Sequence, residues 1–254
     1  MPTVERVRHD LRRRVLEVRR IDDLTPSMRR ITLAGDDLDS FVSAGADDHV
    51  KLFFPPDGDT PPSFGDGNGE RSPSRDFTPR RFDTDAGELV VDFVLHGDGP
   101  AASWAAAAQP GWLIGQGGPR GSFVVSPDFD WYVLAGDETA LPAIGRRLDE
   151  LPPDTHVIVL AEVAGPNDEI ELRAGPDTTV RWLHRGDAQA GASTALEDAV
   201  RALELPAGDG FAWVACEATI ARRLRDHLRE ERGLPASWTR VTGYWTRGVA
   251  DAGH

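Results

Sequence analysis

The sequence has a single cysteine, Cys216, a single lysine, Lys51, and no long run of apolar residues. One thiol excludes an intramolecular disulfide and any metal site built from several thiolates of the same chain. A membrane helix needs about 18 or more consecutive apolar residues, so we expect no membrane insertion. The first 20 residues lack the apolar stretch and cleavage site of a secretory signal, and we therefore expect a cytoplasmic protein.

Basic residues are also scarce. The 254 residues contain 28 Lys and Arg against 42 Asp and Glu, which gives a net charge of −14. This charge repels nucleic acid and anionic membranes at long range, although screening beyond about 8–10 Å leaves room for a local basic pocket. We expect no nucleic-acid partner. Because every other cation is an arginine, Lys51 stands out as a candidate functional residue.

Motifs of several enzyme classes are missing. The histidines show neither HExxH nor HxxxH spacing, and the sequence contains no GxSxG nucleophile elbow. The glycine fingerprint GxGxxG is absent as well. We expect neither a metallohydrolase nor a serine hydrolase, and no metal site formed by the chain itself.

The first half of the sequence has the pattern of an antiparallel domain. Residues 12–54 alternate apolar and polar side chains between turn signals, which is typical of antiparallel strands. Residues 55–74 consist almost entirely of turn-forming and polar residues, which predicts a mobile loop that is too polar to pack. Further strands follow, and an alanine-rich helix after Gly99 is expected to end at Pro110 and Gly111.

The pattern changes after residue 126. Short apolar strands then alternate with amphipathic helices, which predicts an open parallel sheet covered on both faces. The expected fold class is therefore two-domain. An antiparallel β-barrel occupies residues 1–126, and an α/β open parallel sheet occupies residues 127–254.

Two strand ends in the second half are candidate cofactor sites. The strand WYVLAG ends at Gly136, and a helix begins within three residues, near Asp137 and Thr139. Ligands of open parallel sheets bind beyond the carboxyl ends of the strands, where helix N–H groups can hold a pyrophosphate. Capping of the helix by Asp137 explains the turn about as well. Glu217 follows Cys216 at a second strand end, where it favours the helix dipole.

The first half contains two candidate phosphate sites. Arg75 and Phe77 share one face of a predicted strand; arginine can bind diphosphate through its planar donor fork, and an aromatic ring can stack on a flavin. A barrel strand with solvated arginines is the alternative. The stretch from His96 to Trp104 forms a glycine-lined helix start that could hold phosphate, or it is an ordinary loop.

Six segments in order resemble the siderophore-interacting protein family, the flavin-dependent ferric-siderophore reductases of the ferredoxin–NADP reductase superfamily. The resemblance covers nearly the whole chain. The segments are DHVKL at 48–52, RDFTPR at 75–80, the stretch from His96 to Ala105, GPRGS at 118–122, GDETALPA at 136–143 and GYWTRG at 243–248. Two residues depart from the family pattern, because Phe77 stands where tyrosine is usual and Cys216 where glycine is usual.

The resemblance implies roles for residues in both halves. Arg75 would bind FAD phosphate, Phe77 would pack on the isoalloxazine ring, and Thr78 would act catalytically through a hydrogen bond near flavin N5. The remaining FAD residues would be His96, Gly99, Ala101, Ser103 and Trp104. The NAD(P)H residues would be Gly136, Asp137, Thr139, Glu217 and Tyr244. Lys51 and Arg247 would bind the ferric chelate.

The resemblance also implies an activity. NADH or NADPH would deliver hydride to FAD, which would pass single electrons to a ferric siderophore and release ferrous iron. The choice between the two nucleotides stays open, although Arg181, His184 and Arg185 follow a strand whose end could meet a 2′-phosphate. Two alternatives also remain: a general NAD(P)H flavin oxidoreductase with another acceptor, or a non-catalytic ferric-chelate binding protein.

Overall fold

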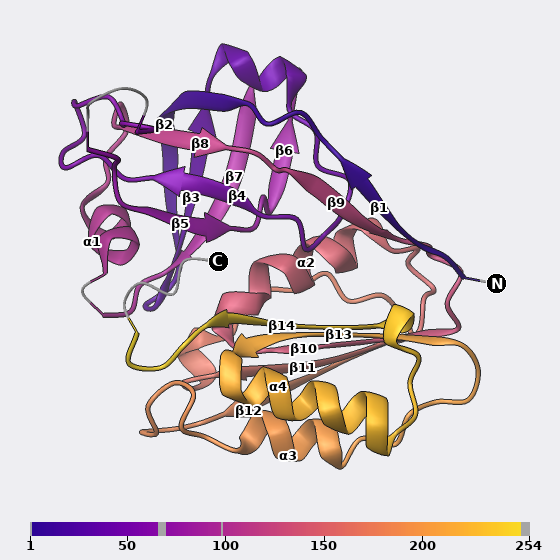
Figure 1. Ribbon diagram of the computed structural model, residues 1–254. Helices are drawn as coiled ribbons and strands as arrows, with labels where there is room; N and C mark the ends of the chain where they lie inside the picture. The colour runs from indigo at the N-terminus through magenta and orange to yellow at the C-terminus, as the bar shows by residue number, and fades with distance from the viewer. Residues whose placement is uncertain (1, 66–69, 98, 250–254) are drawn as a thin grey trace. The chain divides into compact units, whose positions relative to one another are not determined.

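The computed structural model describes residues 2–65, 70–97 and 99–249 (Figure 1). They divide into two compact units, one of residues 5–124 and one of residues 125–249 with residues 2–4. Asp98, in the predicted phosphate loop, and part of the predicted loop 55–74 lie outside the described residues.

A seven-stranded antiparallel sheet forms the unit of residues 5–124. Its strands lie in the order β5-β4-β8-β2-β3-β7-β6, which leaves β5 and β6 at the edges. A separate two-stranded sheet joins β1 (Val4–Arg8) to β9 (Gly121–Val125). The other elements are β2 (Arg13–Thr25), β3 (Met28–Ala34), η1 (Asp36–Ser40), β4 (Val50–Phe53), β5 (Ser74–Phe77), β6 (Arg81–Asp83), β7 (Glu88–Val94), α1 (Pro100–Ala107) and β8 (Leu113–Gly117).

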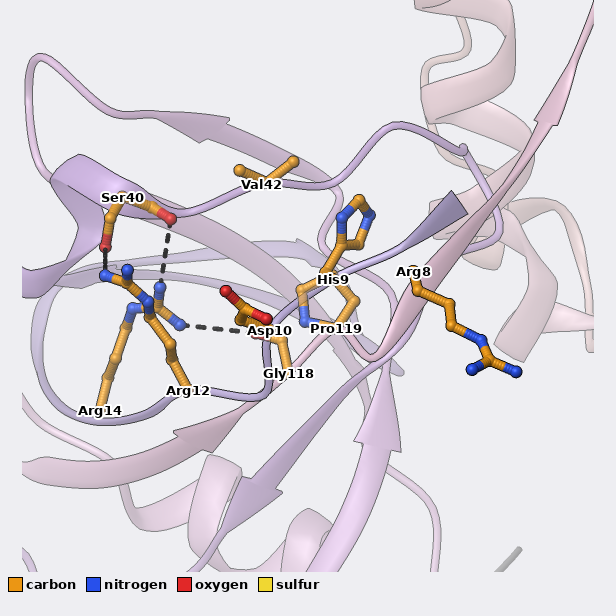
Figure 2. A pocket seen from close by; sticks show the side chains of 9 residues that line it. All are labelled: Arg8, His9, Asp10, Arg12, Arg14, Ser40, Val42, Gly118 and Pro119. Atoms are coloured by element: carbon orange, nitrogen blue, oxygen red, sulfur yellow. Dashed lines mark hydrogen bonds between the residues drawn. The ribbon is translucent and has the colours of Figure 1, made fainter. Parts of the chain in front are cut away.

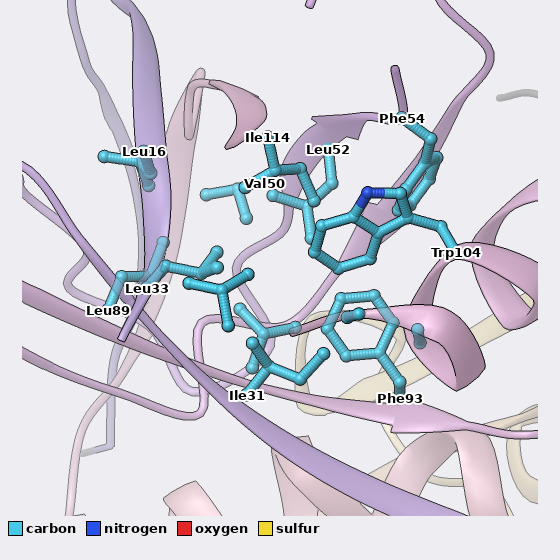
Figure 3. Packing of buried hydrophobic residues seen from close by; sticks show 14 of the residues in the cluster. Leu16, Ile31, Leu33, Val50, Leu52, Phe54, Leu89, Phe93, Trp104 and Ile114 are labelled. Carbon is cyan, nitrogen blue, oxygen red and sulfur yellow. The ribbon is translucent and has the colours of Figure 1, made fainter. Parts of the chain in front are cut away.

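Alternation along the strands builds the core of this unit. In β2, Leu16 and Val18 are buried while Val15 and Glu17 are exposed, as the two-residue period of a strand requires. Figure 3 shows Leu16 with Phe93, Trp104 and other apolar side chains of the same cluster. Each such residue contributes about 1.5–3 kcal/mol when fully buried. The predicted antiparallel strands and the helix before Pro110 are confirmed.

The described part of the loop between β4 and β5 packs against the sheet. The ring of Phe64 lies 4.9 Å from the ring of Phe53, centroid to centroid, and the Gly58 carbonyl accepts a hydrogen bond from Leu113 N at 2.8 Å. Pro62 is buried. The prediction of a loop too polar to pack is therefore wrong for these residues, because its few apolar side chains are the ones placed against the strands.

The unit of residues 125–249 contains a parallel sheet in the order β12-β11-β10-β13-β14. Helices α3 and α4 lie on one face of this sheet and α2 lies on the other (Figure 1). The elements are β10 (Trp131–Gly136), η2 (Glu138–Ala140), α2 (Leu141–Glu150), β11 (Val157–Val163), η3 (Pro166–Asp168), β12 (Thr178–His184), α3 (Ala195–Arg201), β13 (Gly210–Glu217), α4 (Ala218–Asp226), a π turn (His227–Glu231), η5 (Ala236–Trp238) and β14 (Thr239–Trp245). The predicted open α/β sheet is confirmed.

The strand order creates a switch point between β10 and β13. The chain leaves β10 and adds β11 and β12 on one side, then crosses to the other side to add β13 and β14. Connections that depart in opposite directions leave a crevice at the carboxyl ends of the two central strands. No helix within the described ranges is long and apolar enough to cross a membrane.

Candidate functional site

The end of β5 presents the three residues expected at a flavin. Arg75 and Phe77 alternate with Asp76 along the strand, and Phe77 lies opposite Val50 of β4. The Phe77 ring is half-buried, 4.5 Å from the Phe93 ring, so one part of it packs on the core. Thr78 follows the strand and is 7% exposed. Its hydroxyl makes no hydrogen bond within the described part of the chain, which leaves it available to a ligand.

Helix α1 begins without a side-chain cap from any described residue. Gly99 occupies the N-cap position and Pro100 the first helical position, while no side chain of the described residues accepts from the first-turn N–H groups and no acidic residue lies in that turn. The N–H groups of Ala101 and Ala102 therefore have no helical partner. Such a helix start favours an anion by hydrogen bonding and by the helix dipole.

The surroundings of this helix start fit a flavin dinucleotide. Gly97 has a φ of 63°, a left-handed conformation that glycine adopts without strain, and a side-chain atom at Gly97 or Gly99 would meet nothing within 4 Å. His96 and Ser103 are exposed. Trp104 is 5% exposed, and its Nε1 is buried with no hydrogen-bond partner among the described residues. Buried donors normally have an acceptor, so this indole is consistent with a ligand at the site.

The carboxyl end of β10 is tightly packed at Gly136. It pairs with Ala215 of β13, and a Cβ at this position would lie 2.3 Å from both the Ala140 Cβ and the Ala215 carbonyl oxygen. Only glycine allows this approach of strand, turn and neighbouring strand.

Asp137 caps the helical turn that follows. Its Oδ1 accepts from Thr139 N at 3.0 Å and from the Thr139 hydroxyl, and its Oδ2 accepts from Trp245 Nε1 at 2.8 Å. Burial, and secondarily the charge of Glu138, raises the pKa of Asp137 to about 6. The capping interpretation thus accounts for the side chain of Asp137, and contact with NAD(P)H stays a prediction for Gly136, Asp137 and Thr139.

Glu217 caps α4 in the same way at the end of β13. It is 4% exposed and accepts from Thr219 N at 2.7 Å and from Ile220 N at 3.1 Å. Burial alone would raise the pKa of Glu217, but these backbone hydrogen bonds outweigh burial and hold it below its ordinary value. Burial raises the pKa of the neighbouring Cys216 thiol, which therefore stays protonated.

Trp245 is a central residue that sequence reasoning missed. It lies opposite Glu217 at the end of β14, and its indole reaches Asp137 beyond β10. Gly191 has no room for a side chain beside Trp245 and Glu217, so the segment before α3 closes on the same place. Tyr244, the predicted residue, is half-buried with its ring 6.2 Å from Trp213. Only the position of Trp245 within the GYWTRG segment could have indicated its role.

The three candidates for a 2′-phosphate differ in their partners. Arg185 donates to both carboxylate oxygens of Glu138, at 2.6 and 2.8 Å, and His184 contacts Glu169 at 2.7 Å. Arg181 lies inside β12, opposite Leu160 of β11, so the prediction that it follows the strand is wrong. It is exposed and has no ion pair within residues 2–65, 70–97 and 99–249. Of the three side chains, Arg181 is therefore the one that could bind a phosphate without first leaving a carboxylate partner.

The two residues expected at the ferric chelate belong to different units. Lys51 Nζ lies 2.7 Å from Asp76 Oδ1, and both side chains are 26% exposed. Arg247 is exposed, and its backbone N–H donates to Glu217 Oε1 at 3.4 Å. Their joint role stays a prediction. The described part of the chain holds no group of three or more His, Cys, Asp or Glu residues suited to a metal ion.

Two family models match the chain. The model described as siderophore-interacting FAD-binding domain matches residues 17–123, and that described as siderophore-interacting protein matches residues 129–248. The chain belongs to the siderophore-interacting protein family. This confirms the resemblance identified from the six sequence segments.

Solved structures resemble the chain along nearly its whole length. A siderophore utilization protein from T. fusca is 41% identical with a TM-score of 0.88, covering 98% of this chain and 97% of that chain. The ferredoxin reductase of carbazole 1,9a-dioxygenase, 13% identical with a TM-score of 0.68 over 92% of this chain and 69% of its own, shares the fold. The ferredoxin reductase-like fold class is confirmed.

Two relatives carry functional names. The NADPH-dependent ferric-chelate reductase of Escherichia coli is 35% identical over 253 residues, which cover 95% of this chain and 96% of the relative. The ferric vibriobactin reductase of Vibrio cholerae is 32% identical over 245 residues, which cover 92% and 90%.

Proposed function

We propose that the chain is a flavin-dependent NAD(P)H:ferric-siderophore oxidoreductase that releases iron by reducing the ferric chelate. The observation that carries the proposal is the start of α1, where no described residue caps the helix or accepts from the buried Trp104 indole, in a chain of the FAD-binding siderophore-interacting family. The similarity to named ferric reductases supports the reaction. FAD, when bound, supplies the conversion of a two-electron hydride into single electrons that ferric iron can accept.

The residues of the first unit bind and orient the flavin in this proposal. The first-turn N–H groups of α1 and the Arg75 guanidinium hold the diphosphate, because both offer donors to paired oxygens. Phe77 provides an apolar face for the ring system. The free hydroxyl of Thr78 donates a hydrogen bond near N5 and so helps to fix the position of the reacting atom.

The second unit supplies the NAD(P)H site in this proposal. The nucleotide lies across Gly136 to Thr139 at the switch point, with Glu217 and Tyr244 near the nicotinamide ring. Because Asp137 and Glu217 already occupy helix N–H donors, their main task is to hold the turns in place. The ferric ion is substrate and arrives within its chelator, so the chain needs no ligand of its own for it.

An anaerobic titration tests the proposal. Purified protein should show a flavin spectrum, NADH or NADPH should bleach it, and a ferric siderophore should then restore it while a ferrous-specific dye reports iron(II). Comparison of the rates at which NADH and NADPH bleach the flavin shows which nucleotide the protein prefers. Absence of a flavin spectrum after reconstitution would indicate a non-catalytic binding protein. Bleaching without iron(II) would indicate a flavin oxidoreductase with another acceptor.

A further inference from the structure

The unit of residues 5–124 contains a basic cavity away from the residues assigned to the flavin. Its volume is about 270 Å³, and its lining includes Arg8, His9, Asp10, Arg12, Arg14 and Ser40 (Figure 2). Three arginines and a histidine thus surround one space with a single carboxylate, in a chain whose net charge is −14. Neither the β5 residues nor the α1 residues line this cavity.

Arg14 is a buried cation without a carboxylate partner. Its side chain donates to the Asp37 carbonyl at 2.9 Å, to Gln116 Oε1 at 3.1 Å and to the Ser40 carbonyl at 3.4 Å, all of which are neutral acceptors. It is 4% exposed and forms no ion pair within the described part of the chain. Buried charges are normally paired with an opposite charge. Because Arg14 lacks such a partner among the described residues, its positive charge at this wall of the cavity is uncompensated.

The charges around Arg14 do not supply the missing partner. Burial, and then the like charge of Arg12, lower the pKa of Arg14, and these effects outweigh the opposing influence of Asp37 and Asp39. Those two carboxylates are exposed on η1 and therefore strongly screened by water.

Two further guanidinium groups at the cavity are accessible. Arg12 is exposed and donates to the Ser40 hydroxyl at 2.7 Å, which fixes one end of its donor fork. Arg8 is exposed on β1. Neither forms an ion pair with any described residue, and the same holds for Asp10. The remaining donors of both guanidinium groups can therefore bind an anion that enters the cavity.

A hydrogen-bonded chain fixes the orientation of His9. The Ser122 hydroxyl donates to Asp48 Oδ2 at 2.5 Å and accepts from Ala44 N at 2.9 Å, so its only hydrogen is used. The 2.7 Å contact between His9 and Ser122 must then use Nε2–H as the donor. This leaves Nδ1 as the ring nitrogen available to a ligand, and it can donate to an anion when it carries a hydrogen.

We propose that this cavity binds a small oxyanion carrying two or more negative charges, recognised by Arg8, His9 and Arg12 over the buried Arg14. Phosphoryl and polycarboxylate groups share the required chemistry, because both present pairs of oxygen atoms to guanidinium forks. The assignment is independent of the proposed reaction, since it depends only on residues of this cavity.

Calorimetric titration of the FAD-saturated protein tests the site. Inorganic phosphate and citrate are titrated separately in a buffer without other polyvalent anions, and at least one should bind. Tighter binding of phosphate identifies a phosphoryl site, and tighter binding of citrate identifies a polycarboxylate site. The double variant Arg8→Gln/Arg12→Gln should weaken binding about tenfold or more, because it removes the charge-assisted hydrogen bonds of two guanidinium groups.

Two control variants make the test specific. Arg81→Gln removes an exposed arginine of the same unit on β6 and should leave the affinity unchanged. Lys51→Ala should also leave it unchanged. The proposal is wrong if neither anion binds at millimolar concentration, if the double variant binds as well as the parent, or if Lys51→Ala abolishes binding. Arg14 is left intact because its hydrogen bonds hold β2 to η1 and β8.

Discussion

Asp137 is a buried carboxylate whose pKa of about 6 lies above the ordinary value of 3.8. The folded protein therefore binds this proton more tightly than the unfolded chain does. The stabilisation is fully present below about pH 4 and is lost as the pH rises through 6, when a charge must stay buried. We expect Asp137→Asn, which cannot titrate, to gain roughly 1–3 kcal/mol of unfolding free energy relative to the parent between pH 4 and pH 7.

Urea unfolding of both proteins at several pH values measures this difference. Asn keeps only one acceptor oxygen and loses a hydrogen bond from Thr139 or Trp245, which adds an offset that does not change with pH. The slope of the difference against pH, rather than its absolute value, isolates the charge. A flat difference from pH 4 to 7 would show that Asp137 titrates as an ordinary carboxyl.

Lys51 and Asp76 form a pair whose two members should have opposite effects on an anionic substrate. Lys51→Ala leaves Asp76 alone and should raise the KM for an anionic ferric chelate, whereas Asp76→Asn releases Lys51 and should lower it. We expect changes of about threefold to tenfold, because the groups are partly exposed and screened. Steady-state reduction of anionic and neutral chelates measures both effects. Identical changes for the two chelates would contradict a role for the charge.

Arg75 is the residue from which we expect the largest effect on flavin affinity. Replacing it by Ala removes a charge-assisted bond worth about 1.5–3 kcal/mol, which corresponds to one to two decades in Kd. Fluorescence titration of the flavin-free variant with FAD measures its Kd for FAD. Arg81→Ala, on edge strand β6 of the same unit, is the matched control and should bind FAD as the parent does.

At the scale of elements, the helices of the two units differ in whether a side chain caps their N-termini. No side chain of the described residues caps the start of α1, whereas the carboxylates of Asp137 and Glu217 cap the starts of η2 and α4. A carboxylate at a helix start supplies both an acceptor and a favourable charge. This makes the turns after β10 and β13 rigid parts of the sheet edge, while α1 keeps its donors for a ligand.

The turn after β10 also depends on Gly136. A methyl group there would lie 2.3 Å from Ala140 and from the Ala215 carbonyl, so Gly136→Ala must displace either η2 or β13. We expect a loss of about 2 kcal/mol or more of unfolding free energy. Gly165→Ala is the control, because its Cβ meets nothing within 4 Å and its φ of −166° suits any residue. Thermal unfolding of the two variants should differ clearly, and equal stabilities would contradict the packing described for Gly136.

The elements show which predictions a sequence can support. The parallel strands were predictable because continuous apolar runs alternate with amphipathic helices, and the end of α1 because Pro110 and Gly111 follow it. The packing of the loop before β5 was not predictable, because the residues that pack, Phe64 and Pro62, are a small minority in a polar segment. Whether Asp137 caps or binds could not be resolved from its position alone. Its bond to Trp245 joins residues 108 apart in the sequence, a pairing that no local pattern encodes.

At the scale of the whole molecule, a net charge of −14 opposes the approach of an anionic chelate. Salt shortens the range of this repulsion, with a screening length of about 30 Å at 0.01 M and about 8 Å at 0.15 M. We expect kcat/KM for an anionic ferric siderophore to rise about twofold to fivefold over this range, and that for a neutral one to stay nearly constant. Stopped-flow oxidation of reduced protein at several salt concentrations measures this dependence. A fall with salt would indicate that local cations dominate the encounter.

The presence of one lysine among 28 basic residues gives this protein an unusual spectroscopic property. Reductive methylation with isotope-labelled formaldehyde modifies primary amines and leaves arginine untouched, so Lys51 would be the only labelled side chain. Its dimethylamine signal would appear alone, apart from that of the chain terminus. Because the group lies 2.7 Å from Asp76, its chemical shift would follow each change of charge beside it. A two-line carbon spectrum would thus follow the arrival of a ferric chelate analogue without any engineered label.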